Sequence, residues 1–106
     1  MNKFQARQGD IFLDAVNAVP KGATEATPQG PVILALGEAT GHAHAFYDGG
    51  VRYFAPNDQG VAYIDVFADG AELRHEEHAP IKVPRGKYRV IRQREYSPEA
   101  IRNVAD

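Results

Sequence analysis

The fold class is decided by one stretch, Val61-Ala62-Tyr63-Ile64-Asp65-Val66-Phe67-Ala68-Asp69-Gly70-Ala71-Glu72-Leu73-Arg74-His75. Its first seven residues are rich in branched and aromatic side chains, which favour strands. The next three, 68–70, are typical of a chain reversal, and residues 71–75 follow as a second short strand. The stretch therefore predicts a β-hairpin.

The sequence on both sides continues this pattern of short strands and turns. Strand-like runs cover residues 11–16, 32–36, 42–47, 51–54, 81–83 and 87–94. Asp48-Gly49-Gly50 predicts a hairpin between the third and fourth of these runs. The apolar run 32–36 predicts a strand buried on both faces, and residues 24–31, with two prolines and a glycine, predict a long surface loop.

Many short strands at this spacing predict an all-β fold, a small barrel or sandwich. With 106 residues the chain is expected to form a single domain, residues 1–106. Ser97-Pro98-Glu99 has the features of a helix start, so a short C-terminal helix is expected over residues 98–104.

Composition limits the classes of function. The chain has no cysteine, so any bound metal must be held by nitrogen and oxygen ligands. No apolar run approaches the roughly 18 residues that cross a bilayer, and no secretory signal pattern is visible. A cytoplasmic protein without a membrane partner is therefore expected.

The charges are unevenly distributed. Residues 1–81 carry 5 basic and 11 acidic side chains, whereas residues 82–106 carry 7 and 3. A solvated strand face explains the basic tail better than nucleic-acid binding does, because no RNA-binding signature accompanies it. If Tyr88 points inward, Arg92 and Arg94 could reach a pocket and bind a small anionic substrate.

All four histidines lie in two tight pairs, His42 with His44 and His75 with His78. Side chains alternate along a strand, so the first two imidazoles should lie on one face, close enough to bind one ion. The two pairs together predict a divalent metal site, with Zn, Mn, Ni or Fe as the ion.

The second pair leaves two arrangements open. If the chain stays extended, His75 and Glu77 share a face and supply the ligands. If the chain turns before Pro80, His75 and His78 converge, and Glu76 or Glu77 becomes an outer or proton-transferring group. The two-residue gap differs from the helical zinc-protease motif, which excludes that assignment.

The leading interpretation is a metal-dependent enzyme. A redox-inactive ion would lower the pKa of its bound water for hydrolysis or hydration, with Glu76 or Glu77 moving the proton. Iron would instead support oxygen chemistry. The alternative is a binding or interaction module with a structural or sensory ion, and pairing of two copies could cover exposed edge strands.

The stretch from Gly37 to His44 and the later Pro84-Arg85-Gly86 are similar to parts of the cupin pattern. That resemblance implies a small β-barrel whose divalent ion is held by a His-x-His pair, a glutamate and another histidine. The chain also resembles a group of small bacterial and phage proteins that share Gly-His-x-His and His-Glu-Glu-His-x-Pro-Ile, followed by Gln93-Arg94-Glu95-Tyr96.

Overall fold

The computed structural model describes residues 3–36 and 42–92. Every element of regular secondary structure in these residues is a β-strand. They are β1 (Gln5–Gln8), β2 (Ile11–Val16), β3 (Val32–Leu36), β4 (Ala43–Phe46), β5 (Val51–Phe54), β6 (Ala62–Arg74) and β7 (Ile81–Arg92). The all-β prediction is confirmed. The predicted helix at 98–104 lies outside the described residues.

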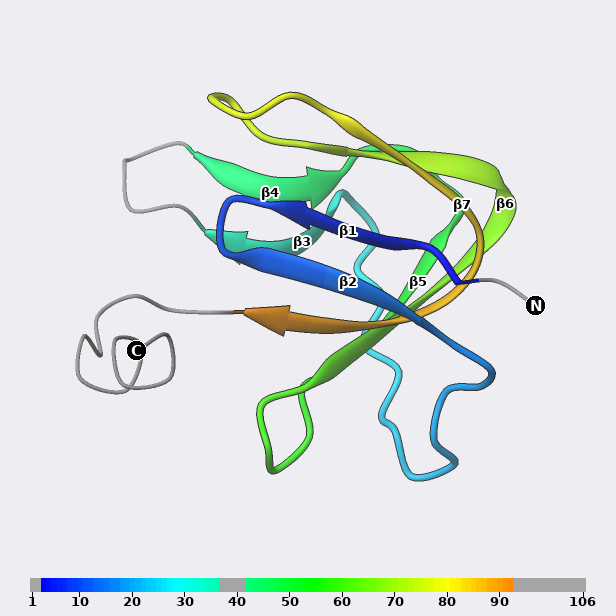
Figure 1. Cartoon of the computed structure of the whole chain (residues 1–106). Coiled ribbons are helices and arrows are strands. Elements are labelled where there is room, and N and C mark those ends of the chain that lie inside the picture. The colour runs from blue at the N-terminus through cyan, green and yellow to red at the C-terminus, as the bar shows by residue number, and fades with distance from the viewer. Residues whose placement is uncertain (1–2, 37–41, 93–106) are drawn as a thin grey trace.

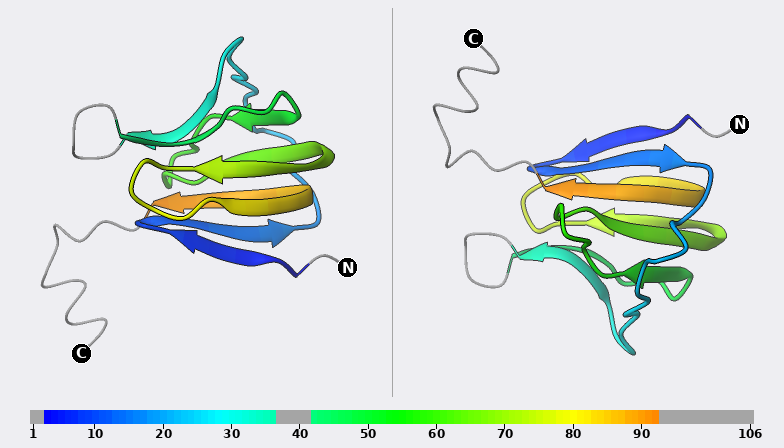
Figure 2. Two further views of the ribbon diagram at one scale, coloured as in Figure 1. Left: turned by 90° about the horizontal axis from the view of Figure 1, so that it is seen from above. Right: turned by 90° about the horizontal axis from the view of Figure 1, so that it is seen from below.

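The strands form one antiparallel sheet in the order β1-β2-β7-β6-β4-β3, with β5 also paired to β6 (Figures 1 and 2). The end strands β1 and β3 are not hydrogen-bonded to each other in the described part of the chain, so the sheet stays open and does not close into the barrel alternative. Strand β7 occupies the centre, between β2 and β6.

The hairpin predicted within residues 61–75 is wrong, because β6 runs through it as one strand of 13 residues. Both halves of β6 pair with β7. Val66 pairs with Gly86 and Gly70 pairs with Pro84, so β6 has more residues than β7 between these two pairs. The turn signal at Gly70 is thus used for a bulge, with φ of +156°. Pro84 is tolerated there because the ladder is irregular.

The hairpin predicted between residues 42–47 and 51–54 is also wrong. Strand β4 pairs with the end of β6, at Leu73 and Arg74, and β5 pairs with its beginning. Asp48-Gly49-Gly50 carries the chain from one half of β6 to the other. The Gly50 carbonyl accepts hydrogen bonds from the Phe67 and Ala68 N–H groups, so this segment pairs with the β6 bulge.

The core is formed by side chains from most of the strands. Its largest fully buried side chains are Tyr88, Phe46, Ile11, Leu13, Ile64, Leu73, Val66 and Val83. The buried Tyr88 ring confirms that this residue points inward, and its hydroxyl donates a 2.7 Å hydrogen bond to the Pro84 carbonyl. This bond satisfies the polar end of a buried aromatic side chain.

Strand β3 is not buried on both faces as expected. It lies at the end of the sheet, where Ile33 and Leu36 are 46% and 64% exposed. An end strand has only one paired neighbour, so part of its apolar surface stays in contact with solvent. The predicted surface loop at 24–31 is confirmed, since every residue in it is exposed. No helix in the described residues is long and apolar enough to cross a membrane.

Candidate functional site

The structure brings all four histidines together at one end of the sheet. His42 directly precedes β4 and His44 lies within it, whereas His75 and His78 lie between β6 and β7. Figure 1 shows the start of β4 and the β6–β7 turn at the same end of the sheet. Their ring centres are 5.5 Å apart for 42 and 75, 4.3 Å for 44 and 75, 5.8 Å for 44 and 78, and 4.7 Å for 75 and 78. Side chains separated by more than 30 residues therefore form one cluster, called here the histidine cluster.

The turn after β6 decides between the two arrangements of the second pair. Strand β6 ends at Arg74, and the chain bends over residues 76–78. As a result the His75 and His78 rings converge, and the extended arrangement of His75 with Glu77 does not occur. The Glu77 N–H donates a 3.0 Å hydrogen bond to His75 Nδ1, which fixes the bend locally.

The two glutamates of this turn have different surroundings. Glu76 Oε1 accepts a 2.9 Å hydrogen bond from the Ala43 N–H, and this bond is the main cause that lowers the pKa of the Glu76 carboxyl. Glu76 therefore ties the turn to β4. The Glu77 side chain is 68% exposed, and its Oε2 lies 3.7 Å from His42 Nδ1. Glu77 therefore lies on the solvent side of the cluster, beside His42.

Gln8, which was not predicted from the sequence, contacts the cluster through His44. Its side-chain amide is buried and donates hydrogen bonds to the carbonyls of Leu73, at 2.9 Å, and Ala79, at 3.0 Å. Its Oε1 lies 2.9 Å from His44 Nδ1. Because the two carbonyls fix the amide orientation, Oε1 must accept from His44 Nδ1–H, which leaves Nε2 of the neutral imidazole with a free lone pair.

Asp10 was missed as well, because the Gly9-Asp10 pair reads in sequence only as a turn. Asp10 Oδ1 lies 3.4 Å from His44 Nε2, and its Oδ2 accepts a 2.8 Å hydrogen bond from Arg92 Nε. Gly9 lies against the same rings, since a Cβ there would be 2.9 Å from His78 Nε2 and 3.0 Å from His44 Cε1. With φ of +60°, Gly9 also has a backbone conformation that favours glycine.

The charges at this point follow from burial and from neighbours. Burial, and then the nearby His75 charge, lower the pKa of His44 to about 4, although Asp10 opposes the change. Burial alone would raise the pKa of Asp10, but the hydrogen bond and charge of Arg92 outweigh it and the net shift is downward. At neutral pH a neutral imidazole therefore faces a carboxylate.

The spacing of the four rings fits a tetrahedral metal site, but their present orientation does not. Four imidazoles on one tetrahedral ion have ring centres about 5 Å apart, close to the spacings observed. The rings of His44 and His78, however, are nearly parallel, at 20°. Among residues 3–36 and 42–92, no group of three or more histidine or carboxylate side chains has its donor atoms already arranged around a metal position.

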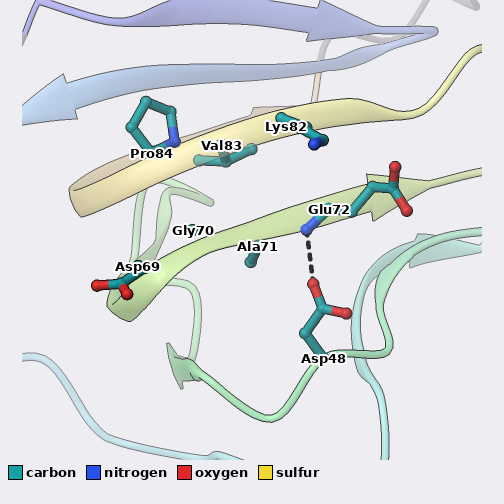
Figure 3. Close-up of a pocket in the computed structure, with 8 residues that line it drawn as sticks. All are labelled: Asp48, Asp69, Gly70, Ala71, Glu72, Lys82, Val83 and Pro84. Atoms are coloured by element: carbon teal, nitrogen blue, oxygen red, sulfur yellow. Dashed lines mark hydrogen bonds between the residues drawn. The ribbon is translucent and has the colours of Figure 1, made fainter.

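Two hollows lie near or beyond the cluster. One of about 350 Å³ is lined by Tyr47, Arg74, His75 and Glu76, and so it opens beside the imidazoles. A larger one of about 660 Å³ lies along the bulged part of β6 and β7, where Asp48 accepts a 2.7 Å hydrogen bond from the Glu72 N–H (Figure 3). No histidine lines the larger hollow.

Arg92, which was expected to reach a pocket, lines neither of these two hollows. Its guanidinium is engaged by Asp10 and donates a 3.0 Å hydrogen bond to the Leu36 carbonyl. Its role is to hold Asp10, and Arg74 is the cation that lines the hollow beside the histidines. Arg94 and Tyr96 lie outside the described residues.

Replacing Gln8 by leucine is expected to lower the free energy of unfolding by about 2 kcal/mol, because two buried carbonyls and the His44 Nδ1–H lose their partner. Urea unfolding followed by circular dichroism measures this change. Gln5→Leu on the same strand is the control, since Gln5 is exposed and bonds only to Asp14. Equal losses for the two variants would contradict the bracing role of Gln8.

These features define a small antiparallel β domain with a cluster of histidines at one end of its sheet. Residues 7–93 match the family model described as Domain of unknown function (DUF8820), and the chain belongs to that family. The matched range includes the four histidines together with Gln8, Asp10 and Arg92. No curated protein and no solved structure matches the chain.

Proposed function

We propose that this protein binds one divalent transition-metal ion through the histidine cluster. The observation that carries the proposal is the convergence of the four imidazoles, in which four of the six pairs of ring centres are 4.3–5.8 Å apart. In a chain without cysteine, imidazole is the ligand best suited to Zn, Ni and Fe. Mn is the weaker binder among the ions expected from the sequence.

Binding requires rotation of some rings but no change of fold. His44 is held by Gln8 with its Nε2 lone pair available. His75 would give up the Glu77 N–H bond on either route, because Nδ1 accepts that bond now and would carry the proton if Nε2 bound the ion. His75 and His78 belong to an irregular turn, and turning a ring about its terminal torsion costs little because those torsions are broad. The spacing is thus present before the ion arrives.

The chemistry that fits this arrangement is hydrolysis by metal-bound water. When bound, such an ion lowers the pKa of its water toward neutrality. Glu77, exposed and 3.7 Å from His42, is placed to accept the proton. Arg74 lines the hollow beside His75 and would bind a small anionic substrate there. Glu76 is tied to Ala43 and serves to position the turn.

A second candidate is an ion with a structural role, and one observation favours it. The site joins β4 to the β6–β7 turn and to the β1–β2 turn through contacts of the Gln8, Asp10 and Glu76 side chains. An ion at that junction would stabilise the fold whether or not it reacts. The resemblance to cupins stays a prediction, and neither candidate depends on it.

Metal binding is tested by titrating purified, chelator-treated protein with Zn²⁺ in competition with a chromophoric chelator. We expect one ion per chain, and we expect His44→Ala to weaken binding by more than the about 10- to 100-fold that follows loss of a group supporting a ligand. Asp69→Asn, which removes only a surface pair with Arg85, is the control. Binding by a variant lacking all four histidines that equals the wild type would refute the proposal.

The hydrolytic role is tested separately, with Zn²⁺-loaded protein and a panel of small phosphate and carboxylate esters. Glu77→Gln should lower kcat, whereas Arg74→Ala should raise KM, because the first residue moves a proton and the second binds the anion. If loaded wild-type protein hydrolyses none of the panel but is strongly stabilised by the ion, the structural role is the correct one.

A further inference from the structure

We infer that Asp10 is a carboxylate ligand of the same ion, and that the turn Gln8-Gly9-Asp10 is the part of the site that is already oriented to bind it. This inference rests on the proposed metal binding. It adds a third segment of the chain, the β1–β2 turn, to the two segments that carry the histidines. The turn joins β1 to β2, a pair of strands that contributes no histidine. It meets the cluster at the end of the sheet where the β6–β7 turn and β4 also lie (Figure 2).

The first argument is the contact between His44 and Asp10. Gln8 Oε1 lies 2.9 Å from His44 Nδ1, so Nε2 is the ring nitrogen that remains toward Asp10 Oδ1, at 3.4 Å. An ion placed beside these two atoms would be bound by both of them.

The distance between His44 Nε2 and Asp10 Oδ1 fits two ligands of one ion. A charged N–H···O contact to a carboxylate is typically about 2.7–2.9 Å long, shorter than the one observed. Nitrogen and oxygen ligands at about 2.1 Å from one tetrahedral ion lie about 3.4 Å from each other. The observed 3.4 Å matches the second case.

The surroundings of Asp10 leave one oxygen for an ion. Arg92 Nε occupies Oδ2 at 2.8 Å, so Oδ1 is the atom that remains toward His44. Ligating carboxylates are commonly held in this way by a group behind them. Arg92 is in turn anchored on the Leu36 carbonyl, which makes it a positioning residue.

Gly9 provides the space that the ion needs. A Cβ at this position would stand 3.2 Å from His44 Nε2 and 2.9 Å from His78 Nε2, so both nitrogens border the volume that glycine leaves empty. His78 is therefore the next ligand after His44 and Asp10. Two imidazoles and one carboxylate leave a fourth position for His75 or for water, as in sites that keep an open position.

The test compares Asp10→Asn with Asp14→Asn in the Zn²⁺ competition titration. The two aspartates make the same kind of contact, since Asp14 Oδ2 accepts a 2.8 Å hydrogen bond from Arg89 Nε on the same strand β7. Only Asp10 contacts a histidine. We expect Asp10→Asn to weaken Zn²⁺ binding by about 100-fold or more and Asp14→Asn to change it by less than about threefold.

A second measurement needs no variant. Addition of Zn²⁺ to wild-type protein should shift the ¹³C carboxylate resonance of Asp10 in nuclear magnetic resonance spectra and leave that of Asp14 in place. Wild-type affinity in Asp10→Asn, together with an unshifted Asp10 resonance and lost binding in His44→Ala, would overturn this inference and leave the proposed function intact. Absence of Zn²⁺ binding by the wild type would overturn both.

Discussion

Phe46→Ala is expected to lower the free energy of unfolding by about 3–5 kcal/mol, the largest effect of any substitution considered for this chain. Phe46 is fully buried and lies opposite Val32 on one side and Leu73 on the other. Removing the ring leaves a cavity where three strands meet. Chemical denaturation followed by circular dichroism measures the loss.

Phe67→Ala is the matched control for the core prediction. Phe67 is 45% exposed, and the Arg52 guanidinium lies 4.9 Å from its ring centre. Its truncation should cost about 1 kcal/mol or less, since it forfeits an exposed cation–π contact and little burial. A loss as large as that of Phe46→Ala would mean that the core has been assigned to the wrong residues.

Phe46→Ala should also weaken metal binding, because Phe46 follows His44 by two residues on β4.

Zn²⁺ at 100 times its dissociation constant is expected to add about 2.7 kcal/mol to the free energy of unfolding. For a domain of this size each kcal/mol corresponds to about 4–8 °C, so the melting temperature should rise by about 10 °C or more. The reason is linkage, because the site joins three segments that separate on unfolding. Differential scanning calorimetry with and without the ion measures the rise, and excess chelator should reverse it.

Two comparisons make that result specific. His44→Ala should show no Zn²⁺-dependent rise, because it removes the one imidazole that is already held in place by Gln8. Mg²⁺ should have no effect on the wild type, since it prefers oxygen ligands in octahedral geometry. Equal stabilisation by Mg²⁺ and Zn²⁺ would contradict an imidazole site and indicate nonspecific binding to carboxylates.

The strands after β1 could be predicted from local sequence, but their partners could not. Residues 68–70 and 48–50 carry ordinary hairpin signals, yet the first forms a bulge and the second a step between two halves of one strand. What decides between these outcomes is the pairing of Gly70 with Pro84 and of β4 with Leu73 and Arg74. Those contacts join distant segments, so no window of local sequence contains them.

The site divides in the same way. The histidines could be found because they are concentrated in two short motifs. The convergence of His75 with His78 was one of two arrangements left open by the sequence, because the turn before Pro80 could not be told from an extended chain. Gln8 and Asp10 could not be found, since β1 reads as polar residues without apolar alternation and its contact with Leu73 spans 65 residues. Their importance is a property of tertiary contact, and an isolated glutamine or a turn aspartate gives no local sign of it.

The central position of β7 has a consequence for how the chain folds during synthesis. Among the described residues, β7 is the only strand that links the β1–β2 pair to the group of β6, β4 and β3 by backbone pairing. Pairings of such long sequence separation form slowly. During synthesis from the amino terminus, the side chains of residues 8–10, 42–44 and 75–78 all precede Ile81–Arg92 in the chain. A nascent chain that stops at residue 80 would thus contain every proposed ligand and still have no strand to bring the two groups together.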